Sequence, residues 1–155
     1  MKFHYSRPNL TEADVAAVVS VLRQQFLSQG PIVEQLENKL RRLFSVKNAV
    51  VCNSGTAALH MAYDAIGLGP EAGLITSSVT FLATANAARF CDAPVGFADV
   101  DPLTGNVTVE TLKAAVNAAK FNVKAIAVVH LGGRPCDIIA IKDYADSIGA
   151  HLIED

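Results

Sequence analysis

The sequence predicts an α/β domain built in layers, with a mostly parallel sheet flanked by helices. Short apolar segments alternate with helical segments from residue 49 to the end of the chain. These predicted strands are apolar almost throughout, which is typical of strands covered by helices on both faces. Gly67 and Gly149 follow two of the helical segments, where a left-handed residue commonly ends a helix. The pattern therefore favours one layered domain or part of one.

Two helices are expected before the first strand. Residues 11–14 resemble a capping box, and apolar side chains then recur at helical spacing as far as Phe26. The first helix is expected to end near residues 29–31. Pro31 suits the first turn of a second helix, whose apolar stripe ends at Phe44.

The remainder of the chain alternates strand and helix. Strands are expected at 49–52, 74–76, 95–98, 125–129 and 151–154. Helices are expected between them at 56–66, 81–90, 108–119 and 137–148. Because such alternation builds right-handed crossovers, the strands should run parallel.

Composition excludes several classes of protein. The net charge of −2 over 155 residues, with no basic face, argues against a nucleic-acid partner. Three cysteines at wide spacing favour a reducing compartment over a disulfide framework. Neither a signal peptide nor a membrane-spanning run is recognisable, so a cytoplasmic protein is expected.

The junction at residues 48–59 is the strongest candidate for a binding site. An apolar run leads through Ser54, Gly55 and Thr56 directly into an alanine-rich helix. Backbone N–H groups at a helix N-terminus attract anions, and a glycine lets a ligand approach closely, so a phosphate would fit. An ordinary N-cap with a tight turn explains the same residues equally well.

Other candidates follow the later strands, because ligands of α/β sheets collect at the carboxyl ends of strands. Phe81 could face a ligand or pack in the core, and Asp155 could be a functional acid or an ordinary strand-end residue. His130 is interpreted as structural, and no metal site is expected because it has no companion pair at ligand spacing. Cys136 precedes a helix, which could lower the pKa of its thiol, although a small turn residue is the simpler interpretation.

Taken in order, the motifs resemble the DegT-type sugar aminotransferases, a branch of the fold-type I pyridoxal-phosphate enzymes. The resemblance covers essentially the whole chain. It rests on residues 6–9, 27–31, 53–59, 80–84, 97–102, 129–137 and 153–155. The chain would then be the N-terminal part, residues 1–155, of the large domain that binds the cofactor, without the small C-terminal domain.

The resemblance assigns roles to four residues. Gly55 and Thr56 match the turn that binds the phosphate of pyridoxal 5′-phosphate, and Phe81 matches the aromatic ring that stacks on its pyridine. Asp155 matches the carboxylate that pairs with the pyridine nitrogen, where a negative charge keeps the nitrogen protonated. The implied reaction moves an amino group from glutamate to the 4-keto group of a nucleotide-linked deoxysugar, nearest to the pseudaminic-acid transaminases, in a homodimer.

The lysine that forms the Schiff base in this family lies beyond the acidic strand motif, and no lysine here matches it. The chain alone is therefore expected to be inactive. The lysines present are Lys2, Lys39, Lys47, Lys113, Lys120, Lys124 and Lys142. Two alternatives stay open: a non-catalytic module that binds nucleotide sugars or phosphate, and a relative of the sugar dehydratases that use the same cofactor.

Overall fold

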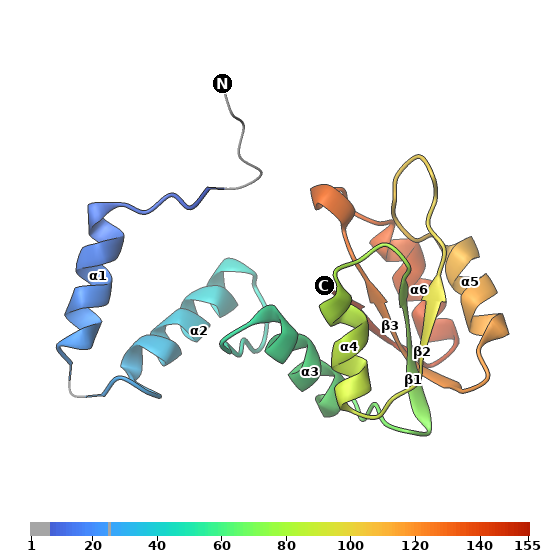
Figure 1. Cartoon of the computed structure of the whole chain (residues 1–155), viewed down its shortest axis with the longest axis horizontal. Coiled ribbons are helices and arrows are strands. Elements are labelled where there is room, and N and C mark those ends of the chain that lie inside the picture. Colours follow the sequence, from blue (N-terminus) through green and yellow to red (C-terminus); the bar gives the residue numbers. More distant parts are fainter. Residues whose placement is uncertain (1–6, 25) are drawn as a thin grey trace. The chain divides into compact units, whose positions relative to one another are not determined.

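The computed structural model describes residues 7–24 and 26–155 and divides the chain into two compact units, Met1–Val51 and Cys52–Asp155 (Figure 1). Lys2 and Ser6, named above, lie outside the described residues. No helix among the described residues is long and apolar enough to cross a membrane.

The first unit contains two helices, α1 (Glu12–Leu22) and α2 (Pro31–Leu43). The expected capping box is present, because the Thr11 side chain accepts from the Asp14 amide and the Asp14 carboxylate accepts from the Thr11 amide. The expected continuation of α1 beyond Leu22 is wrong. No side chain of this helix is buried among the described residues, so packing does not hold a further turn.

The strand expected at 49–52 is also absent from the described structure. A strand requires a neighbour to complete its backbone hydrogen bonds, and the amide of Val51 instead donates to the Glu37 carboxylate at 3.1 Å. Val50 is 69% exposed. The apolar composition of this run was therefore not sufficient to predict pairing.

The second unit contains a parallel four-stranded sheet in the order β2-β1-β3-β4 (Figure 1). Its strands are β1 (Ala72–Ser77), β2 (Val95–Ala98), β3 (Asn122–Val128) and β4 (His151–Glu154). The helices are α3 (Gly55–Ala65), α4 (Leu82–Phe90), α5 (Val109–Ala118) and α6 (Ile138–Ser147), with a short 3₁₀ turn η1 (Leu131–Gly133). The expected parallel α/β arrangement is confirmed.

Two apolar clusters lie on opposite faces of this sheet. One joins α3 and α4 to the sheet around the buried Tyr63 and Leu74, and the other joins α5 and α6 around Leu112 and Ile126 (Figure 1). Burial on both faces explains why the strands lack polar alternation. At residues 67 and 149 the glycines predicted to end helices have φ of 75° and 68°, so those caps are confirmed.

Candidate functional site

The candidate site lies where strands of the sheet end and α4 begins. A helix that connects neighbouring parallel strands must start at their carboxyl ends, and α4 does so between β1 and β2. Asp155 directly follows β4, and its amide donates to the carbonyl of Val128 at the end of β3 at 2.9 Å. The terminal acid is therefore held at the edge where α/β proteins bind ligands.

The Asp155 carboxylate is bound by a side chain from α4. The Thr84 hydroxyl donates to Oδ2 of Asp155, which lies 71 residues further along the chain. Thr84 is fully buried, whereas Asp155 is exposed. Among the residues that the structure describes, Oδ1 of Asp155 has no hydrogen-bond partner. One carboxylate oxygen is thus fixed and the other is available.

Tyr63 of α3 supports the same position of α4. Its phenol donates to the backbone carbonyl of Thr84 at 3.1 Å. Burial raises the pKa of the Tyr63 phenol well above its usual value, and the nearby Asp155 carboxylate and Cys91 thiol raise it further. The phenol therefore stays protonated and remains a donor at physiological pH.

The turn at Gly55 has the form of an anion site. The Ser54 side chain caps α3 by accepting from the amide of Ala57 at 3.1 Å. The amides of Gly55 and Thr56 belong to the first helical turn, which has no intrahelical partners for them. A Cβ placed on Gly55 would meet nothing within 4 Å. Among the described residues neither amide has a hydrogen-bond partner, so two donors stand unpaired at the positive end of a helix dipole, beside a glycine with no neighbour at its Cβ position.

Phe81 is exposed, contrary to the alternative that it packs in the core. It is the N-cap residue of α4 and is 79% exposed. An exposed aromatic ring at a helix start can present its face to a flat ligand. The structure thus leaves this ring available for the role that the motif resemblance implied.

The four predicted residues occupy three places in the unit. Gly55 and Thr56 begin α3, Phe81 precedes α4, and Asp155 follows β4. Helices α3 and α4 pack together in one cluster, yet no hydrogen bond joins any two of the four residues. Sequence reasoning missed Tyr63 and Thr84. Thr84 lay within a recognised motif, but nothing in the sequence indicated its partner.

The loop after β3 is held by His130. Its Nδ1 accepts from the amide of Cys136 at 3.0 Å, so Nε2 carries the proton and donates to the Glu154 carboxylate at 3.0 Å. This agrees with a structural role for His130. The alternative that the following helix lowers the pKa of the Cys136 thiol is wrong. Burial raises this pKa, and the nearby Glu154 charge raises it further.

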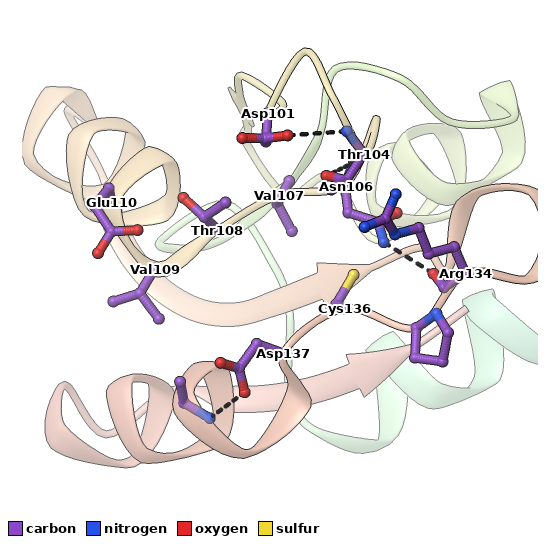
Figure 2. Close-up of a pocket in the computed structure, with 12 residues that line it drawn as sticks. Asp101, Thr104, Asn106, Val107, Thr108, Val109, Glu110, Arg134, Cys136 and Asp137 are labelled. Carbon is purple, nitrogen blue, oxygen red and sulfur yellow. Dashed lines mark hydrogen bonds between the residues drawn. The ribbon is translucent and has the colours of Figure 1, made fainter.

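A cleft of about 380 Å³ lies on the other face, between the loops that follow β2 and β3 (Figure 2). Its polar groups hold its own walls together. The Asp101 carboxylate accepts from the amide of Thr104 at 2.9 Å, and Asn106 donates to the carbonyl of Arg134 at 2.9 Å. Hydrogen bonding within the turn lowers the pKa of Asp101. None of the four predicted residues lines this cleft.

The parallel sheet, the helix N-termini and the acid at the strand ends place this chain among the α/β proteins, a class that binds ligands at the carboxyl edge of the sheet. Comparison with known proteins specifies the class. Residues 8–155 match the DegT/DnrJ/EryC1/StrS aminotransferase family, and the chain belongs to this family. The aminotransferases of this family use pyridoxal 5′-phosphate.

Several relatives are similar to nearly the whole chain. The spore coat polysaccharide biosynthesis protein SpsC of Bacillus subtilis is 39% identical over 97% of the chain and 38% of the relative. The UDP-4-amino-4,6-dideoxy-N-acetyl-beta-L-altrosamine transaminase of Campylobacter jejuni is 36% identical over 97% of the chain and 40% of the relative. The chain therefore spans about two-fifths of the length of these relatives.

Solved structures show the same fold. An aminotransferase from Psychrobacter cryohalolentis matches with a TM-score of 0.88 and 33% identity, over 96% of this chain and 37% of that one. Helicobacter pylori PseC, an aminotransferase involved in the biosynthesis of pseudoaminic acid, matches with a TM-score of 0.88 and 27% identity. This match covers 100% of this chain and 41% of PseC.

Proposed function

We propose that this chain is the N-terminal part of the cofactor-binding large domain of a sugar aminotransferase. The complete reaction moves an amino group from glutamate to the 4-keto group of a nucleotide-linked deoxysugar. The observation that carries this proposal is the Asp155 carboxylate at the carboxyl edge of the sheet, with one oxygen held by Thr84 and the other without a partner among the described residues. The similarity to nucleotide-sugar transaminases supports the substrate class.

The residues present fit pyridoxal 5′-phosphate. The free amides of Gly55 and Thr56 at the start of α3 would bind its phosphate, and the absence of a side chain at Gly55 leaves room for it. The exposed ring of Phe81 would stack on the pyridine. Asp155 would accept a hydrogen bond from the pyridine nitrogen.

When bound, the cofactor supplies an electron sink for the carbon from which a proton is removed during amino transfer. The contribution of Asp155 is to keep a proton on the pyridine nitrogen, because a nearby negative charge stabilises the protonated form. Gly55 and Thr56 would donate hydrogen bonds to the phosphate at the positive end of the helix dipole and so fix its position. The exposed Phe81 ring would cover one face of the pyridine and shield that face from water.

We further propose that this chain alone does not complete the reaction, which needs a lysine to hold the cofactor. Two lysines have contacts on the α5 and α6 side of the sheet: the Lys142 amine pairs with Asp146, and the Lys113 amine lies over the Tyr144 ring. Lys124 lies near the start of β3, away from the carboxyl edge. In this proposal the protein acts in the cytoplasm and pairs as a homodimer.

The binding half of the proposal is tested with pyridoxal 5′-phosphate and the variant Gly55→Ala. A Cβ at residue 55 clashes with nothing in the chain, and alanine favours the helix by up to about 1 kcal/mol. We expect affinity for the cofactor to fall about tenfold because the methyl group blocks the phosphate, while the urea midpoint stays equal or rises. Gly69→Ala, where the added Cβ meets only a carbonyl oxygen at 3.9 Å, is the matched control.

Unchanged affinity in Gly55→Ala would contradict the phosphate assignment. The catalytic half is tested by incubating the chain with cofactor, glutamate and a UDP-linked 4-keto-6-deoxy-N-acetylhexosamine, followed by an assay for 2-oxoglutarate. We expect none. Steady formation of 2-oxoglutarate would overturn the proposal that the chain alone is inactive, whereas saturable binding of the UDP-sugar without cofactor would favour a non-catalytic binding module.

A further inference from the structure

We infer that Thr84 is a positioning residue that orients the Asp155 carboxylate toward a ligand carrying a ring N–H group. The inference rests on the proposed function, because it concerns the acid that would pair with the pyridine nitrogen. It extends that function by naming a residue, on a different element from Asp155, that determines which carboxylate oxygen meets the ligand.

The first support is the direction of the hydrogen bonds. Thr84 uses its only hydroxyl proton on Oδ2 of Asp155, so in its 2.8 Å contact with the Thr80 hydroxyl it must be the acceptor. The protons therefore run in one direction, from Thr80 to Thr84 to Asp155. Both hydroxyl protons in this series of hydrogen bonds therefore point toward the carboxylate. Because Oδ2 already accepts from Thr84, Oδ1 is the oxygen that can accept from an incoming N–H group.

The second support is the rigidity of Thr84. Its side chain is fully buried in the first turn of α4, and a β-branched side chain in a helix has few accessible χ1 rotamers. Tyr63 from α3 donates to its backbone carbonyl at 3.1 Å. The hydroxyl is thus fixed by its own helix, by a neighbouring helix and by Thr80, whereas the exposed Asp155 has no other side-chain partner among the described residues.

The consequence is a selective effect on ligands. Without the Thr84 hydroxyl, an exposed aspartate at a strand end can rotate, and its carboxylate is no longer presented in one orientation. A ligand with a ring N–H group would lose affinity. A ligand of the same shape with carbon in place of the ring nitrogen makes no hydrogen bond to Asp155 and would be unaffected.

The test uses two probes that need no covalent bond to the protein: pyridoxine 5′-phosphate, and its analogue with C–H in place of the ring nitrogen. For Thr84→Val, we expect affinity for pyridoxine 5′-phosphate to fall about tenfold and affinity for the analogue to change less than twofold. Thr84→Ser keeps the hydroxyl and should restore binding of the first probe. Equal losses for both probes in Thr84→Val would overturn the inference.

Thr76→Val is the matched control, because Thr76 is also fully buried and donates to a backbone carbonyl, that of Ala127, at 3.0 Å. It loses the same kind of hydroxyl without a link to Asp155. We expect Thr76→Val to leave the ratio of the two affinities unchanged. A ratio shifted as far as in Thr84→Val would also overturn the inference.

If neither probe binds, the proposed function is refuted. A second measurement then tests the inference without any ligand. In the ligand-free chain, unfolding is measured for Thr84→Val, Asp155→Ala and the double variant. If Thr84 holds Asp155, the effect of the double variant on the unfolding equilibrium constant differs from the product of the two single effects by at least about threefold. Multiplicative effects would overturn the inference independently of any ligand.

Discussion

Replacing Tyr63 with phenylalanine removes one buried hydroxyl and one titratable group from the contact between α3 and α4. The phenol donates to the Thr84 carbonyl at 3.1 Å and is fully buried. At pH 8 we expect Tyr63→Phe to lower the free energy of unfolding by about 1 kcal/mol. The cost is modest because a carbonyl in the first turn of a helix also accepts from a backbone amide one turn later.

The pH dependence of the free energy of unfolding gives a sharper test than its value at one pH. Burial and the Asp155 charge raise the pKa of Tyr63 above its ordinary value of 10.0. Above pH 10 the unfolded chain therefore releases a proton that the folded chain keeps, so the stabilisation present below pH 10 is lost as the pH rises toward the folded pKa. One pH unit above 10, this single group lowers the free energy of unfolding by up to about 1.4 kcal/mol.

Tyr63→Phe lacks this group, so its deficit should shrink from about 1 kcal/mol at pH 8 to near zero at pH 11. The assay is urea unfolding followed by circular dichroism at both pH values, with the difference between the two proteins as the readout. Taking the difference cancels the titration of lysines and of the other tyrosines. A deficit that stays constant from pH 8 to pH 11 would refute the reasoning.

Three further outcomes test the packing. Gly73→Ala should lower the free energy of unfolding by about 1–3 kcal/mol, because its Cβ would lie 2.3 Å from the Phe121 ring; an unchanged urea midpoint would count against this. Asn106→Ala should cost about 2–3 kcal/mol in the same assay, because Asn106 is 4% exposed and bridges two loops through both ends of its amide; a loss below 0.5 kcal/mol would mean that water replaces it. Iodoacetamide at pH 7 should label the exposed Cys52 before the buried Cys136, whose thiol pKa is raised; the reverse order by mass spectrometry would contradict the structure.

Much of the fold could be predicted because its signals are local. The sequence predicts the strands at 95–98 and 151–154 at their observed bounds, and each end of the four helices in the second unit lies within one residue of expectation. Helix caps and apolar runs act over a few residues, so the sequence states them directly. The prediction of a strand at 49–52 is wrong because strand pairing depends on a partner that is distant in the sequence.

The candidate site divides in the same way. Motifs in the sequence were enough to identify the family and to select Gly55, Thr56, Phe81 and Asp155, and the roles of these four residues stay predictions. Only the tertiary structure brought Thr84 to Asp155, 71 residues away, and left Phe81 exposed. It also reversed the expected direction of the Cys136 pKa. Exposure, side-chain pairing and pKa depend on which distant segments pack together, whereas turns and helix starts depend on neighbouring residues, and the sequence by itself determines only the latter.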